Sequence, residues 1–331
     1  MKKYFLVLML GIITMACQSE QEQGIIDNEA QRGIASKNIE SKMLQFETVK
    51  ELKSFINDRL ESDSDLLEEA KEMSSSGRYN PLLLIYNLES SEAKSLGINQ
   101  KEVAKVGSDD NMLLFLLNQN GEIAIEGKIF RIDGDFVYTY TKGFSNTINE
   151  FLEKYNSGAI KLEKGKRIDY TKELNVYAHT NTFTDVNVKE KAMARGVTAH
   201  KYFDSNHRMR ARQFNGFWGF YSAIGANTLV QQKKKFLWWS WWKTVKTDNR
   251  LEYNVAFRSN VTPGYPGYPS SLNVAKSGHK YCNCNQAQAV YSWSVGFPWA
   301  PENYTPLEGE SKHWAHWYSA NPNTVSITLQ Y

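Results

Sequence analysis

The sequence LEYNVAFR, residues 251–258, alternates apolar and polar side chains. Because successive side chains of a β-strand point to opposite faces, this pattern predicts a strand with one buried and one exposed face. Residues 325–331 alternate in the same way, and three arginines, Arg208, Arg210 and Arg212, alternate with apolar residues. These three strands predict an all-β C-terminal domain, for which a β-sandwich is the first expectation and a barrel the second.

The N-terminal part of the chain carries helix signals and then strand signals. Thr48 and Glu51 fit a capping box, and apolar residues then recur at helical spacing. Residues 81–88 are apolar without a clear period, and three short apolar runs within 123–140, separated by glycine turns, predict a meander. Three further helical patterns lie at 66–73, 108–117 and 148–155. Together these elements predict an α+β domain over residues 43–160.

The two halves of the chain differ in charge and in aromatic content. From residue 18 to 175, 20 Lys plus Arg stand against 28 Asp plus Glu, a net charge of −8; from 176 to 331, 17 stand against 8, a net charge of +9. All nine tryptophans lie between Trp218 and Trp317. This change predicts two domains, with 17–42 as a flexible tether, 161–195 as a linker and 196–331 as an aromatic-rich all-β domain.

The first residues follow the pattern of a bacterial lipoprotein precursor. Two lysines precede an apolar run from Tyr4 to Met15, and Cys17 follows directly after a small residue. The run is shorter than the about 20 residues that span a bilayer, and the small residues before the cysteine are typical of a secretory cleavage site. We therefore expect 1–16 to be removed as a signal peptide and Cys17 to be lipidated. The alternative is an ordinary secretory peptide whose cysteine is incidental.

Several segments resemble surface lipoproteins of Bacteroidetes. FLLNQNGEI, residues 115–123, followed by GKIFRI, residues 127–132, is similar to a segment common in that family, and the basic, aromatic stretch 208–243 is similar to part of the second half of some members. Acidic residues directly after Cys17 resemble the surface-export tethers of the same lipoproteins. The resemblance implies one two-domain architecture and an outer-membrane location facing outward, and it brings no catalytic residue or ligand.

A tryptophan-rich segment is the first candidate binding site. Trp238, Trp239, Trp241 and Trp242 have lysines on both sides. On a regular strand Trp239 and Trp241 would share one face, and Trp238 and Trp242 the other. Exposed indoles with cationic neighbours suit stacking on sugar rings or contact with a protein or lipid surface. The alternative is that one pair lies in the core and the other is covered.

The basic face of the predicted strand at 208–212 is the second candidate. Arg208, Arg210 and Arg212 would present three guanidinium groups to an anionic polymer. The surface location disfavours nucleic acid and favours an acidic glycan or lipopolysaccharide. The alternative is a solvated face, or a face covered by the acidic N-terminal domain.

The sequence is compatible with two interpretations of Cys282 and Cys284, a disulfide and a metal site. One intervening residue on a strand puts the two thiols on the same face, and His279, His313 and His316 could add metal ligands. However, the spacing matches no strong metal motif, and no Gly-rich phosphate loop, serine elbow or zincin histidine pair occurs. We therefore expect no catalytic residue, no metal and no cofactor.

The sequence thus predicts a lipid-anchored protein of the outer membrane that binds a carbohydrate or a host macromolecule without catalysis. Its expected partners are membrane lipid, through Cys17, and a glycan or host protein, with no nucleic acid. A structural or assembly component of an envelope complex is the second expectation, and a secreted hydrolase is the third.

Cys17→Ser is expected to move the protein from the membrane fraction to the soluble fraction, because the substitution removes the attachment point for the acyl chains. Burial of acyl chains contributes about 0.8 kcal/mol per CH₂ group, so their loss removes the membrane anchor. Fractionation of cells expressing the variant measures this. Unchanged retention in the membrane would rule out the lipoprotein interpretation.

Overall fold

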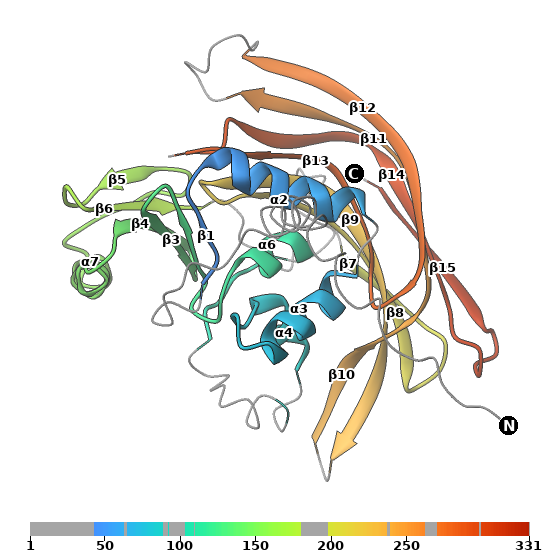
Figure 1. Cartoon of the computed structure of the whole chain (residues 1–331). Coiled ribbons are helices and arrows are strands. Elements are labelled where there is room, and N and C mark those ends of the chain that lie inside the picture. Colours follow the sequence, from blue (N-terminus) through green and yellow to red (C-terminus); the bar gives the residue numbers. More distant parts are fainter. Residues whose placement is uncertain are drawn as a thin grey trace, which may run out of the picture. The chain divides into compact units, whose positions relative to one another are not determined.

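Strands form most of the described chain and make three sheets (Figure 1). The computed structural model describes residues 43–62, 65–88, 92, 103–108, 110–179, 198–236, 239–261, 270–297 and 299–330. Residues 1–42, with the predicted signal peptide, Cys17 and the tether, lie outside this part. The prediction of a largely β protein is confirmed.

Hydrogen bonds at their first turns define the N-terminal helices. Thr48 caps α2 by accepting a hydrogen bond from the backbone N of Glu51, with 3.2 Å between the two atoms. Asp65 and Asp110 cap α3 and α6 through their carboxylates. The helices are α2 (Val49–Glu61), α3 (Leu66–Ser75), α4 (Leu82–Asn87) and α6 (Asn111–Leu116). The helices predicted after Thr48 and within 66–73 and 108–117 are confirmed, and α4 occupies the apolar stretch that the sequence pattern leaves open.

The N-terminal sheet has six strands in the order β1-β2-β3-β4-β6-β5. Its centre is the predicted meander, whose first turn has positive φ at both Glu126 and Gly127, as two-residue hairpins of type I′ require. Helix α7 (Asn146–Asn156) packs Phe151 against Phe136 of this sheet, with 5.6 Å between ring centroids. The strands are β1 (Gln45–Phe46), β2 (Glu122–Ile125), β3 (Lys128–Asp133), β4 (Phe136–Thr141), β5 (Arg167–Asp169) and β6 (Leu174–Ala178).

Part of the predicted linker 161–195 is not a linker. Strands β5 and β6 lie within it and complete the N-terminal sheet, and Leu174 and Val176 are buried in the same cluster as Phe151. The strands were missed because each is short, so alternation carries little signal. Residues 180–197 lie outside the described part. The described residues belong to one compact unit, Ile39–Tyr331, and the division into two domains stays a prediction.

The C-terminal half forms two further sheets. The inner sheet contains β7 (Thr198–Tyr202), β8 (His207–Phe217), β9 (Tyr221–Phe236), β10 (Trp239–Val245) and β13 (Ala287–Val295). The outer sheet contains β11 (Thr247–Val261), β12 (Ser271–Cys284), β14 (Glu302–His316) and β15 (Thr324–Gln330). The strands predicted at 208–212, 251–258 and 325–331 are therefore confirmed as parts of β8, β11 and β15.

The inner sheet is covered on both faces. One face packs Ile224 and Ala226 against Leu251 and Phe257 of the outer sheet. The other face lies toward the N-terminal helices, and Figure 1 shows these helices on the side of β9 that faces away from the outer sheet. No helix in the described part of the chain is long and apolar enough to cross a membrane.

A buried polar network links the inner and outer sheets. His313 of β14 has its Nδ1 atom 2.7 Å from Thr228 Oγ1 of β9 and its Nε2 atom 2.8 Å from Ser311 Oγ. Gln213 of β8 donates a hydrogen bond to the same Ser311 hydroxyl. Each of these four side chains is fully buried. Burial lowers the pKa of His313 to about 3, so the imidazole is neutral in the folded protein at neutral pH.

Acidification is expected to reduce stability through His313. The pKa of His313 in the folded state lies below the usual 6.5. Its contribution to the free energy of unfolding is therefore complete above pH 6.5 and is lost as the pH falls toward 3. From pH 7 to pH 5 the folded state should lose about 2 kcal/mol through this group. Urea unfolding at the two pH values measures the loss, and His313→Gln should show a decrease smaller by about that amount. An identical decrease in the variant would contradict the assignment.

Candidate functional site

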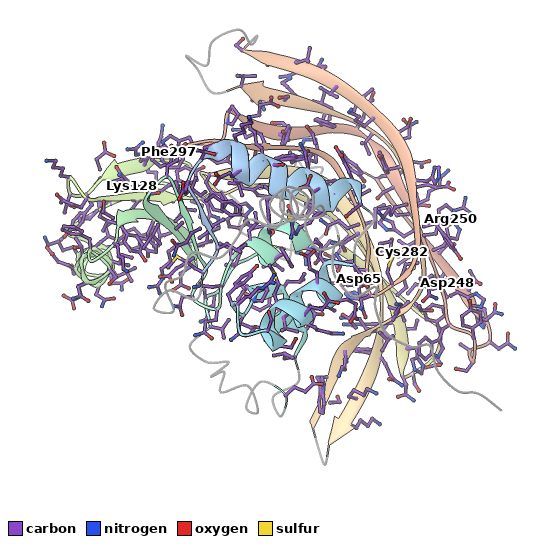
Figure 2. The ribbon with its side chains drawn as sticks, viewed as in Figure 1. Asp65, Lys128, Asp248, Arg250, Cys282 and Phe297 are labelled. Carbon is purple, nitrogen blue, oxygen red and sulfur yellow. A yellow bond between two sulfur atoms is a disulfide. The ribbon has the colours of Figure 1, made fainter. Side chains whose placement is uncertain are left out.

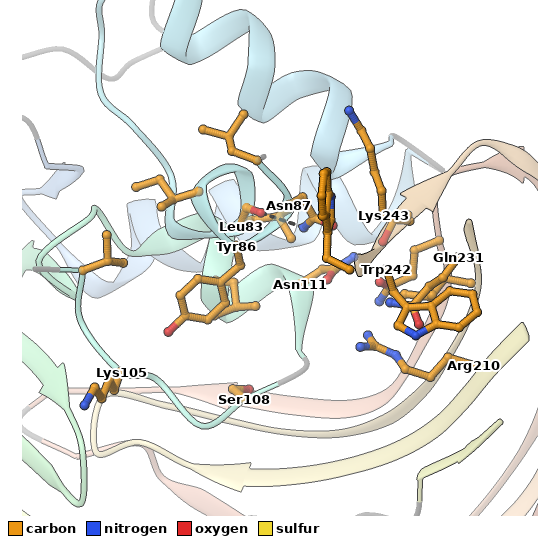
Figure 3. Close-up of a pocket in the computed structure, with 18 of the residues that line it drawn as sticks. Leu83, Tyr86, Asn87, Lys105, Ser108, Asn111, Arg210, Gln231, Trp242 and Lys243 are labelled. Atoms are coloured by element: carbon orange, nitrogen blue, oxygen red, sulfur yellow. Dashed lines mark hydrogen bonds between the residues drawn. The ribbon is translucent and has the colours of Figure 1, made fainter. Parts of the chain in front are cut away.

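A cleft of about 700 Å³ lies between the N-terminal helices and the inner sheet (Figure 3). Helix α4 and the segment 103–108 line one side, where Tyr86 and Asn87 lie. Strands β8, β9 and β10 line the other side, where Arg210, Gln231 and Trp242 lie close together. The volume falls within the range of about 300–1,000 Å³ that is typical of ligand pockets.

The carboxylate of Asp110 fixes one wall of the cleft against the other. Besides capping α6, Asp110 accepts a hydrogen bond of 2.5 Å from the Tyr221 hydroxyl of β9 and one of 3.0 Å from Gln288 Nε2 of β13. The backbone N of Asn111, which lines the cleft, donates to Gln288 Oε1 at 3.0 Å. Burial raises the pKa of Asp110 and raises that of Tyr221 well above its usual value. These hydrogen bonds therefore connect helix α6 to the inner sheet beside the cleft.

A second carboxylate contact crosses between the two halves at the end of β12. Asn285 donates to Asp65 Oδ2 from its backbone N and from its side chain, each at 3.2 Å, and to Glu68 Oε1 at 2.9 Å. A hydrogen bond from Lys71 is the main cause that lowers the pKa of Glu68, so this group is ionised. Asp65, labelled in Figure 2, also caps α3. The contact holds the neighbouring Gln286 at the cleft.

The three arginines of β8 share one face, as predicted, but have different surroundings. Arg210 is paired in register with Leu229 and lines the cleft. Burial and the charge of Arg208 lower the pKa of Arg210 to about 10, and burial lowers the pKa of Arg212 to about 10, so both stay charged at neutral pH. Arg208 donates to Gln231 Oε1 at 2.9 Å and lies outside the lining.

Two tryptophans of the predicted run reach the cleft. Trp241 and Trp242 are both half-buried and both line it. The guanidinium of Arg208 lies 4.1 Å from the ring centroid of Trp242, and the Tyr202 ring approaches Trp242 from another side at 5.9 Å. These contacts hold the Trp242 indole in position. Trp238 and the side chain of Trp239 lie outside the described part of the chain.

The lining of the cleft is cationic. Among its described residues are Lys105, Arg210 and Lys243, and none is Asp or Glu. Lys243 Nζ lies 3.2 Å from the carboxylate of Glu92, which is itself not part of the lining. Sequence reasoning found the arginine and tryptophan side of this cleft but missed the side that carries Tyr86, because no local signal says which helix covers which face of a sheet.

The residues considered for a metal site lie in different places. Cys282 and Cys284 form a disulfide at the end of β12. His313 is buried between the sheets, whereas His279 is exposed on β12 and His316 is half-buried on β14. Among the described residues no group of three or more His, Cys, Asp or Glu side chains could hold a metal ion.

Comparison with known proteins identifies no relative: no family model matches the chain, and no curated protein or solved structure matches it. The chemistry of the cleft is therefore deduced from its own residues.

Tyr221→Phe is expected to lower the free energy of unfolding by about 2 kcal/mol, because the buried Asp110 carboxylate loses a hydrogen-bond donor. Urea unfolding measures the loss. Tyr155→Phe is a matched control, because the half-buried Tyr155 hydroxyl makes no hydrogen bond within the described residues. Equal stability of the two variants would show that Asp110 does not depend on Tyr221.

Proposed function

We propose that this protein is a lipid-anchored surface protein that binds an acidic carbohydrate in the cleft and does not act on it catalytically. The observation that supports this proposal is the composition of the lining. Cations and two indoles line the cleft, and no carboxylate lies among its described lining residues. The anchor at Cys17 and the outer-membrane location belong to the proposal and rest on the sequence pattern.

Acidic sugars combine the two features that this lining fits. Their carboxylate or sulfate groups accept charge-assisted hydrogen bonds from arginine, and the apolar faces of their rings pack on indoles. Arg210 and Trp242 lie close together on one side of the cleft (Figure 3). Asn87 and Asn111 add amides on the opposite side, where the Tyr86 hydroxyl is bonded to the backbone of Ala104 and Val106. One ligand could therefore contact charged, aromatic and polar groups at once.

The scaffold supports a binding role. We propose to class the inner and outer sheets as a β-sandwich, with the N-terminal α+β part covering one of its faces. In such a scaffold one side of the cleft stands on strands, and strands fix side-chain positions more firmly than loops do. Glycoside hydrolysis commonly needs two carboxylates that flank the bond to be cut. The absence of Asp and Glu from the described lining therefore favours binding over hydrolysis.

Titration of the protein with an oligogalacturonate tests the proposal. The wild type is expected to bind with an affinity that falls as salt rises, because screening weakens the ionic contacts. Arg210→Gln should reduce the affinity about 30-fold or more, since the ligand's charge loses a desolvated partner. Isothermal titration calorimetry measures both effects.

The matched control is Arg78→Gln, which removes the same charge from an exposed turn away from the cleft. This variant should bind as the wild type does. Thermal unfolding of both variants checks that they fold. Equal affinities of Arg210→Gln and Arg78→Gln, or no binding by the wild type at low salt, would overturn the cleft as a site for acidic sugars.

A further inference from the structure

The exposed face of the outer sheet carries a row of aromatic and charged side chains. Arg250 of β11 pairs in register with Tyr281 of β12 on one side and with Trp314 of β14 on the other. Neighbouring strands lie about 4.8 Å apart, so the backbones that carry the two rings are about 10 Å apart. Leu251, the next residue along β11, is buried between the sheets, so Arg250 points outward. Figure 2 shows Arg250 on the side of this sheet that faces away from the helices.

A third ring, that of Tyr318, extends the row at the end of β14. The Tyr318 hydroxyl donates a hydrogen bond to Asp248, and Asn283 Nδ2 donates to the same carboxylate at 2.7 Å. Both hydrogen bonds lower the pKa of Asp248, so this group is ionised. Tyr281 is 61% exposed and Tyr318 is 71% exposed. Two large rings are thus open to solvent although neighbouring side chains hold one of them in place.

The ring of Trp314 also contacts a neighbouring side chain. The guanidinium of Arg250 lies 5.2 Å from the ring centroid of Trp314 and forms an ion pair with Glu252. These two contacts keep the guanidinium beside the indole. Rings that are already fixed lose little conformational entropy when a ligand packs on them.

Two hollows make this face a groove. One, of about 300 Å³, contains Asp248, Tyr281, Trp314 and Tyr318, and the other, of about 370 Å³, contains His279 and Lys312. Arg250 lines both hollows, so they are neighbours on this face of the sheet, and together they are called the groove.

The two cations of the groove each pair with a carboxylate, whereas the ionised Asp248 is bound by the neutral donors Tyr318 and Asn283. Arg250 pairs with Glu252, and Lys312 Nζ lies 3.0 Å from Glu310 Oε1. Each cation thus has a carboxylate of the same face beside it. A charged ligand would have to compete with these ion pairs. The hydroxyl groups of an uncharged sugar can instead donate hydrogen bonds to the carboxylates and accept them from the cations.

We propose that the groove binds a neutral polysaccharide chain, with successive sugar rings packed on Tyr281, Trp314 and Tyr318. Spaced rings on a polar surface whose cations are already paired with carboxylates fit a chain that has apolar ring faces and hydroxyl edges. The site lies on a different sheet from the cleft and does not depend on the function proposed there.

Affinity electrophoresis in gels that contain laminarin, dextran, xylan or galactomannan tests the proposal. At least one of these neutral polysaccharides is expected to retard the wild type, and high salt should leave the retardation unchanged. Trp314→Ala should weaken it about tenfold or more, as expected when an aromatic anchor is lost. Tyr281→Ala, which removes a largely exposed ring, should weaken it without affecting folding.

Phe144→Ala is the matched control, because Phe144 is an exposed ring in the turn before α7 and lies outside the groove. This variant and Arg210→Gln should both be retarded as the wild type is. Retardation by none of the four polysaccharides would overturn the proposal. Equal retardation of Trp314→Ala, Tyr281→Ala and Phe144→Ala would also overturn it, and so would binding that high salt abolishes, which would indicate an ionic partner such as a protein.

Discussion

The buried carboxylate of Asp110 is the contact on which the arrangement of the two halves depends. It caps α6 within its own half and accepts hydrogen bonds from Tyr221 and Gln288 of the inner sheet. A buried charge without such partners would cost several kcal/mol, so α6 is confined to a position where they are present. Strand β9, which carries Tyr221, also pairs with β8 and β10. The position of Asp110 therefore sets the distance between the helical wall of the cleft and the strands that carry Arg210 and Trp242.

Opposite net charges of the two halves do not simply neutralise each other where they meet. The carboxylates that reach across from the N-terminal half contact neutral groups: Asp65 binds Asn285, and Asp110 binds a tyrosine hydroxyl and an amide. Glu92 instead pairs with a cation of the C-terminal half, Lys243. Neutral donors satisfy these carboxylates without using the cations of β8.

Local signals in the sequence predicted individual elements well and their contacts poorly. The cap at Thr48 and the alternation of β11 depend on neighbours in sequence, so they could be identified from sequence alone. Strand β9 shows no clean alternation, because residues 222–231 are buried on both faces of the inner sheet. The arginines and tryptophans of the candidate site could be identified from the sequence as binding residues because of their side-chain chemistry. That only Arg210 lines the cleft, and that α4 covers it, follows from sheet pairing over long sequence separations, which no local pattern encodes.

The two proposed sites differ because the two sheets have different neighbours. The inner sheet is covered by helices, so its site is a cleft, where partial desolvation strengthens the attraction between Arg210 and an anion. The outer sheet has one face open to water, where Arg250 and Lys312 are paired with carboxylates of the same face and the rings offer contact area. Stacked sheets lie about 10 Å apart, so a ligand in the cleft and one on the groove do not touch. A glycan with acidic and neutral regions could nevertheless engage both sites, and the second contact would then be intramolecular and favoured by its effective concentration.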